Sequence, residues 1–135
     1  MESVERKMRI PSSVDEIRHV QTAVQREMKR FGYGRDACFG MKLALEESLI
    51  NAIKHGNHFD RGRWVHVRYE IDDRRAKVTV RDEGAGFDPD AVPDPTSDEN
   101  LTKPSGRGIM LMRAYMDDVS YGADGCEVCM VKNRR

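Results

Sequence analysis

The sequence lacks the features that mark membrane, secreted and disulfide-bonded proteins. None of its apolar runs approaches the roughly 20 residues needed to cross a bilayer, and its N-terminus has no apolar secretory core. Its three cysteines, Cys38, Cys126 and Cys129, are too few for a disulfide scaffold. We therefore expect a cytoplasmic protein that works in a reducing compartment and does not associate with a membrane.

The chain also lacks an excess of either charge, with 23 basic and 23 acidic side chains and a formal net charge of zero. A balanced chain has no general attraction to nucleic acid, so a polyanion must be held by a local site. We accordingly expect no direct nucleic-acid partner. With 135 residues, 39% of them hydrophobic, the chain can form one compact domain over residues 1–135.

Cys126 and Cys129 form a Cys-x-x-Cys pair that has two interpretations. The pair lies in an alternating stretch with Val128 and Met130, which is typical of a strand, and the sequence has no second pair. This context favours small buried side chains. Half of a zinc or redox motif is the alternative.

Hydrophobic periodicity predicts an α+β fold. Apolar residues recur every three or four positions in helical segments at about 14–31, 36–55 and 108–116. They alternate with polar residues in strands at about 7–11, 65–71, 76–80, 118–121 and 127–131. This order predicts a two-layer α/β sandwich, in which helices cover one face of a mainly antiparallel, mixed sheet. A long acidic loop with several prolines, at about 88–105, separates the two halves.

The second helical segment carries a polar stripe although it is mostly apolar. Glu47, Asn51 and His55 stand four residues apart and therefore share one face of a regular helix. A carboxylate one turn from an amide places a proton acceptor beside a neutral oxygen ligand, which suits Mg²⁺ and a reacting phosphate. The alternative is that these side chains face water or make local hydrogen bonds.

A second cluster follows the strand at 76–80. Asp82, Gly84 and Gly86 alternate at its end. Glycines let the backbone approach a ligand closely, and a fixed carboxylate can accept a hydrogen bond from an amino group. The alternative is an ordinary turn, because turns after strands often contain these residues.

A third cluster, Gly106-Arg107-Gly108, directly precedes the last helical segment. Backbone N–H groups and the helix dipole at such a position favour an anion such as phosphate. The alternative is a plain glycine-rich helix start.

Together the three clusters resemble the N-box, first glycine box and second glycine box of the GHKL, or Bergerat-fold, ATPases. More narrowly, the segments 43–56, 80–87 and 116–119 resemble the small anti-sigma-factor serine kinases. The resemblance extends over about residues 10–131 and implies the Bergerat ATP-binding fold, a histidine-kinase-like ATPase domain.

The resemblance implies a role for each motif residue in binding ATP and Mg²⁺. Asp82 would accept the adenine amino group, and Asn51 would hold Mg²⁺ bridging the phosphates. Segment 88–105 would be the ATP lid. The residues that would lie against the nucleotide backbone or wrap its phosphates are Gly84, Gly86, Gly106, Arg107 and Gly108.

The resemblance also implies an activity and partners. Such a protein is an ATP-dependent serine-protein kinase acting as an anti-sigma factor. It phosphorylates one serine of an antagonist, the anti-anti-sigma protein, and it holds a sigma factor. The resemblance also suggests that the protein is a homodimer. Glu47 would be the catalytic base; Glu46 points about 100° away on a helix and cannot share its face. The alternative is a non-catalytic, nucleotide-dependent protein-binding module, although the intact pair of Glu47 and Asn51 favours catalysis.

Overall fold

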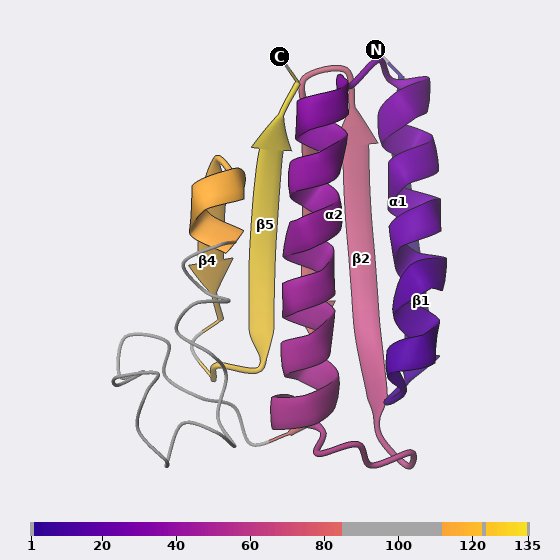
Figure 1. The fold of residues 1–135 in the computed structure, drawn as a ribbon, viewed down its shortest axis with the longest axis vertical. Helices are drawn as coiled ribbons and strands as arrows, with labels where there is room; N and C mark the ends of the chain where they lie inside the picture. Colours follow the sequence, from indigo (N-terminus) through magenta and orange to yellow (C-terminus); the bar gives the residue numbers. More distant parts are fainter. Residues whose placement is uncertain (1, 85–111, 123, 135) are drawn as a thin grey trace.

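The computed structural model describes residues 2–84, 112–122 and 124–134, which form an antiparallel sheet with helices on one face (Figure 1). This confirms the predicted α+β, two-layer arrangement. The elements in chain order are β1 (Ser3–Pro11), a 3₁₀ turn (Val14–Glu16), α1 (Ile17–Arg30), α2 (Arg35–Ile50), a π-helix (Asn51–Gly56), β2 (Trp64–Asp72), β3 (Arg75–Arg81), β4 (Asp118–Tyr121) and β5 (Glu127–Asn133).

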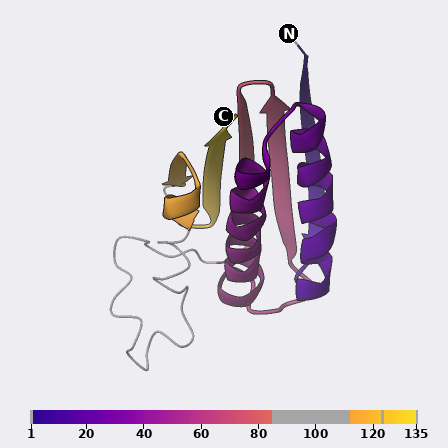
Figure 2. The ribbon, with the colours of Figure 1, turned by 45° about the horizontal axis from the view of Figure 1, so that its top comes forward.

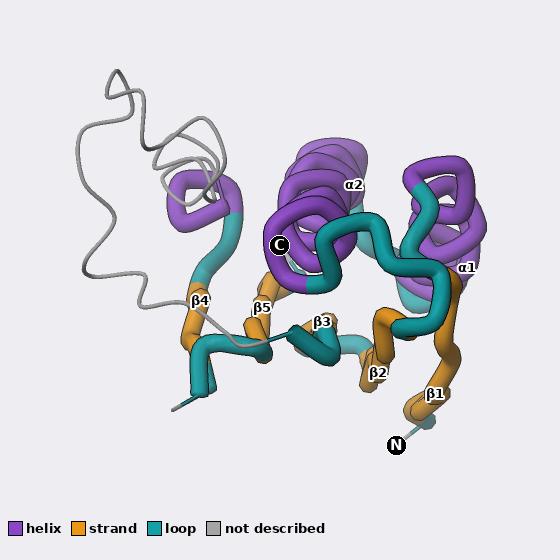
Figure 3. The backbone as a smooth tube through the Cα atoms, turned by 90° about the horizontal axis from the view of Figure 1, so that it is seen from below, coloured by secondary structure: helices purple, strands orange, loops and turns teal. Residues whose placement is uncertain are grey.

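The five described strands form one sheet in the order β1-β2-β3-β5-β4, and each neighbouring pair is antiparallel. Viewed from below, α1 and α2 lie on the same side of the sheet (Figure 3). The tilted view shows the two helices side by side along the strands (Figure 2). The helical layer therefore covers one face of the sheet and leaves the other face open.

The period of two in β2 explains this two-layer packing. Val65, Val67 and Ile71 are buried against the helices, whereas His66 and Arg68 point to the open face. Burying each such apolar side chain contributes about 1.5–3 kcal/mol. Four α1 residues at helical spacing supply the other side of the core: Ile17, Val20, Val24 and Met28.

Two element boundaries differ from the sequence expectation. β1 begins at Ser3 rather than near Lys7, because pairing with β2 extends to Asp72. The second helical segment, expected to be α-helical over 36–55, changes at Asn51 into a π-helix. Of the last predicted helix, residues 112–115 are helical, and 108–111 lie outside the described residues.

None of the helices within the described ranges combines the length and apolar character that a membrane span requires.

Candidate functional site

A small cavity of about 20 Å³ lies where the end of α2, the end of β3 and the start of β5 meet. Asn51 and Asp82, which the sequence placed in two separate clusters, both line it. The structure therefore brings two of the predicted motif residues to one cavity.

Asp82 is the buried acceptor of this cavity. It directly follows β3, is 7% exposed, and its backbone N–H donates to the Cys126 carbonyl at 2.9 Å. Its Oδ1 accepts a hydrogen bond from the Gly84 N–H at 2.8 Å. Burial raises the pKa of Asp82, opposed by hydrogen bonds from Gly84 and Cys126. A carboxylate offers about four acceptor positions, so the group can accept an additional donor within the cavity.

Cys126 and Tyr121 form part of the cavity wall, and sequence reasoning gave neither a role there. The Cys126 thiol donates to the Gly84 carbonyl oxygen at 3.1 Å. Burial raises the pKa of Tyr121 to about 12, so its phenol stays protonated at neutral pH. The alternation of the sequence indicated only that these positions lie in or near strands. It could not show that they line a cavity, because that depends on which strands become neighbours.

The cysteine pair does not converge on a shared ligand. Cys126 is buried and lines the cavity, whereas the partly exposed Cys129 lines a hollow on the open face of the sheet. The cavity and the hollow lie on opposite faces of the sheet, which separates the two thiols. Within the described ranges, no group of three or more His, Cys, Asp and Glu residues could hold a metal ion. The interpretation as buried side chains is confirmed for Cys126 and is wrong for Cys129, which is partly exposed.

Gly56 and Gly84 allow two backbone segments to meet beside Asp82. A Cβ atom on Gly84 would overlap the carbonyl oxygen of Gly56 and lie 2.6 Å from its carbonyl carbon. A Cβ atom on Gly56 would in turn overlap the Asp82 carboxylate, whose Oδ1 would be 2.7 Å away. The site therefore requires glycine at both positions for steric reasons, and the predicted approach of Gly84 to a nucleotide stays a prediction.

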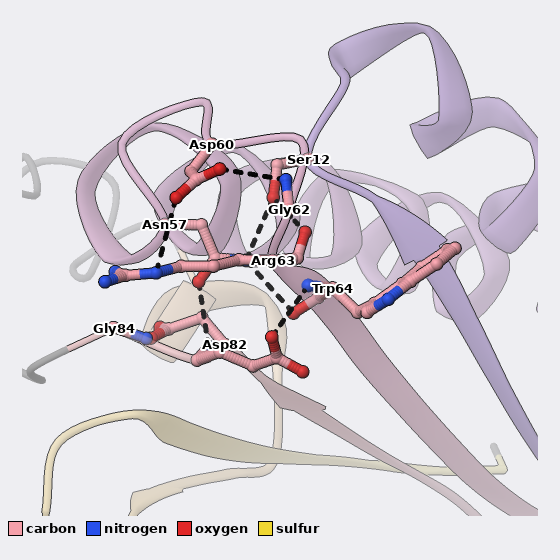
Figure 4. A network of polar contacts seen from close by, with 9 residues as sticks. Ser12, Asn57, Asp60, Gly62, Arg63, Trp64, Asp82 and Gly84 are labelled. Carbon is pink, nitrogen blue, oxygen red and sulfur yellow. Dashed lines mark hydrogen bonds and ion pairs between the residues drawn. The ribbon is translucent and has the colours of Figure 1, made fainter.

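Asn57 joins the three chain segments that border the site, and the sequence analysis did not identify it (Figure 4). It is fully buried. Its Oδ1 accepts from the Glu83 N–H at 2.8 Å, and its Nδ2 donates to Ser12 Oγ and to the Trp64 carbonyl, each at 3.0 Å. Ser12 Oγ donates onward to the Arg63 carbonyl at 2.7 Å. The network fixes the segment after β3 against the ends of β1 and α2.

The π-helix determines where Asn57 points. The Asn57 N–H donates to the carbonyl of Ala52, five residues earlier, at 2.8 Å. A π-helical turn holds more residues than an α-helical turn, so it changes the direction of every side chain that follows. The expected stripe of Glu47, Asn51 and His55 consequently does not continue as a regular α-helical face. Such turns occur often at functional sites.

Glu47 lies one turn before Asn51, but it is not among the described residues that line the cavity. It is half-buried, and burial, with a smaller effect of the neighbouring Glu46, raises its pKa. Glu46 is exposed and borders a groove between α1 and α2. The two carboxylates thus face different surroundings, as expected from helix geometry, and the role of Glu47 as a base stays a prediction.

Glu83, next to Asp82, fastens the same segment to β2. Its Oε1 accepts from the Trp64 N–H at 3.0 Å, and its Oε2 lies 2.7 Å from His66 Nε2. The His66 contact is the main reason that the pKa of Glu83 is lowered. The Arg9 guanidinium covers the Trp64 ring at 4.1 Å. Trp64 and His66 therefore help to position the segment that carries Asp82.

The remaining predicted site residues, Gly86, Gly106, Arg107 and Gly108, lie outside the described residues, as does the lid segment 88–105. Their roles stay predictions.

Comparison with known proteins identifies the protein family of this chain. The family model of the histidine kinase-like ATPase domain matches residues 10–132. The chain belongs to this family, which confirms the resemblance seen in its motifs.

Individual relatives narrow the comparison. The chain is 29% identical to the serine-protein kinase RsbW of Staphylococcus epidermidis, covering 93% of this chain and 84% of that protein. It is 28% identical to the serine-protein kinase RsbW of Bacillus subtilis (strain 168), and the match covers 93% of this chain and 82% of that protein. Its fold is similar to the RsbU and RsbW domains of Rv1364c from Mycobacterium tuberculosis, with a TM-score of 0.63 and 14% identity. That match covers 96% of this chain and spans about a third (32%) of the solved chain.

Proposed function

We propose that this protein is an ATP-dependent serine-protein kinase that acts as an anti-sigma factor in a partner-switching pathway. Its membership of the histidine kinase-like ATPase family and its similarity to proteins named serine-protein kinase RsbW support this proposal. In this proposal it is cytoplasmic, phosphorylates a serine of an antagonist protein, and otherwise holds a sigma factor, as a homodimer.

The observation that carries the proposal is the cavity shared by Asp82 and Asn51. A buried carboxylate suits an adenine amino group, because charge-assisted hydrogen bonds are stronger than neutral ones. Gly56 carries no side chain that would overlap this carboxylate. These two features provide an acceptor for the amino group of adenine.

Asn51 fits the metal that accompanies such a nucleotide. It follows α2 directly, lines the cavity, and carries a neutral amide oxygen, a ligand type that Mg²⁺ accepts. ATP with Mg²⁺ supplies the phosphoryl group and neutralises charge on the leaving oxygens. Asn51 would hold the metal, and Gly106, Arg107 and Gly108 would bind the phosphates.

Glu47 would take the proton from the hydroxyl of the acceptor serine. A base works best when its pKa is close to the operating pH, and burial shifts the pKa of Glu47 in that direction. The acceptor serine belongs to the antagonist, so the base must be reachable from outside the nucleotide cavity. The half-buried position of Glu47 satisfies this requirement.

The position of Glu47 outside the cavity lining also supports a second candidate function. A non-catalytic module would use nucleotide only to select which protein it binds, and it would need Asp82 and Asn51 but no base. Nucleotide binding is common to both candidates, and phosphate transfer separates them.

Two measurements test the proposal. Calorimetric titration should detect ATP binding that requires Mg²⁺ for full affinity, and a protein that binds no adenine nucleotide would refute both candidates. Affinity capture from the source cell in ATP and in ADP should then recover different partners, one of which becomes phosphorylated on serine in ATP. Nucleotide-dependent capture without phosphorylation would favour the non-catalytic module.

A further inference from the structure

A second surface, separate from the nucleotide cavity, lies between the two long helices. It is a groove of about 860 Å³ bordered by exposed or partly exposed side chains of α1 and α2. The two helices lie side by side on the outer side of the molecule (Figures 1 and 3). The groove therefore opens away from the sheet.

Two glutamines of α1 fix the groove by binding the backbone of α2. Gln21 Nε2 donates to the Lys42 carbonyl at 3.0 Å, and Gln25 Nε2 donates to the Cys38 carbonyl at 2.9 Å. These bonds are one helical turn apart on each helix and hold the two helices in register. The groove is thus a preformed surface, which lowers the entropic cost of binding a partner.

The groove concentrates positive charge in a chain whose net charge is zero. Arg18, Arg26 and Lys29 project from α1, Lys42 projects from α2, and all four are exposed. In the described part of the chain, none of the ion pairs involves any of these four side chains. By contrast, arginines elsewhere, such as Arg68 and Arg81, are paired with carboxylates. The groove therefore holds cations that the protein itself does not neutralise.

The two ends of the groove differ in their charge and in their position along α2. α1 and α2 run antiparallel, so Arg18 lies toward the end of α2 and Lys29 toward its beginning. The one acidic side chain bordering the groove, Glu46, is one residue before Glu47. A partner lying along the groove would place its acidic part on Arg26, Lys29 and Lys42 and its less acidic end toward Glu46.

We propose that this groove, lined by Arg18, Arg26, Lys29 and Lys42, binds an acidic segment of a protein partner. Electrostatic complementarity of this kind steers association and fixes orientation. The proposal goes beyond the kinase function and does not require it, because the groove contains none of the residues assigned to ATP.

The test measures binding of a fluorescein-labelled peptide of alternating glutamate and alanine to the full chain without nucleotide, by fluorescence anisotropy. The same peptide with glutamine in place of glutamate is the neutral control. The acidic peptide should bind with an affinity that falls as salt rises, and the glutamine peptide should not bind. Equal binding of the two peptides to the unmodified protein, or no binding of either, overturns the proposal without use of any variant.

Charge reversals place the peptide on the groove. The double variant Arg26→Glu, Lys42→Glu should weaken binding of the acidic peptide about 10-fold or more. The double variant Lys7→Glu, Arg61→Glu makes the same change in net charge at two exposed positions outside the groove; it is the control and should have a much smaller effect. Equal weakening by both, or tighter binding of a single-stranded oligonucleotide of the same charge, overturns the assignment to an acidic protein segment. Because the assay contains no ATP, failure of the kinase proposal would leave its result unchanged.

Discussion

Gly56 and Gly84 approach so closely that neither position leaves space for a side chain. Gly56 ends the π-helix that follows α2, and Gly84 is two residues beyond Asp82. Their contact brings the polar end of the helix against the end of β3. The distance between Asn51 and Asp82 across the cavity therefore depends on two glycines, one from each motif.

Gly84→Ala should lower ATP affinity about 100-fold, because the new methyl group meets rigid backbone at Gly56 and displaces Asp82. Calorimetric titration measures the effect. Gly62→Ala is the matched control, since its methyl group would meet only the Asp60 side chain, at 3.2 Å. Similar ATP affinities of the two variants would show that the contact does not shape the site.

Asp82→Asn should lower ATP affinity by about 10- to 100-fold, which corresponds to the loss of one charge-assisted hydrogen bond. The amide retains an oxygen that can accept from the Gly84 N–H, so the loop should keep its conformation. Unchanged affinity in the same titration would contradict the assignment of adenine recognition to Asp82.

The same substitution should affect stability in a pH-dependent manner. The pKa of Asp82 is raised in the folded state, mainly by burial. The favourable contribution of its neutral form is therefore complete below the unfolded-state pKa and is lost as pH rises through the folded-state pKa. Asp82→Asn should gain stability relative to the parent at neutral pH and lose this advantage in acid. Thermal melts at both pH values check the sign, and a gain confined to acid would contradict it.

Glu47→Gln should slow serine phosphorylation by about 10²- to 10⁴-fold and leave ATP affinity unchanged. The rate of the parent should rise with pH as Glu47 loses its proton, and the variant should lack this rise. Glu46→Gln is the control. Removing the charge of Glu46 should lower the pKa of Glu47 and move the pH dependence of the rate to lower pH. Full activity of Glu47→Gln would remove Glu47 from the mechanism.

Asn57→Ala should reduce the free energy of unfolding by about 3 kcal/mol, since it breaks three side-chain hydrogen bonds in a fully buried place. Ser12→Ala, which removes the two hydrogen bonds of the neighbouring hydroxyl, should cost about 2 kcal/mol. Denaturant titration measures both. Equal losses would mean that Asn57 does not join the three segments as the hydrogen bonds indicate.

The sequence was sufficient to predict the layers and the main motifs. Apolar residues at intervals of three and four marked α1, and strict alternation marked β2 and β3, because each face of these elements meets only one environment. The positions of Asp82 and Asn51 could also be predicted, since a strand end and a helical stripe have recognisable patterns. The structure adds that these two residues line one cavity.

Other features could not be read from local patterns. The first residues of β1 are mostly polar, and their strand conformation depends on pairing with β2. Asn57 resembles an ordinary residue after a helix, and only the meeting of three segments shows its role. Spacing alone cannot distinguish the π-helix at Asn51–Gly56 from a regular helix, because the same residues fit either geometry.

The wide turn at Asn51–Gly56 also limits how the length of this segment can vary. Removing one residue from it would allow an ordinary helix to form, and each later side chain would rotate by about 100°. Asn57 would then leave its partners on the strands, although every amino acid of the network would still be present. Among proteins of this architecture, the number of positions between Asn51 and β2 should therefore be conserved more strictly than the identity of the residues that fill them.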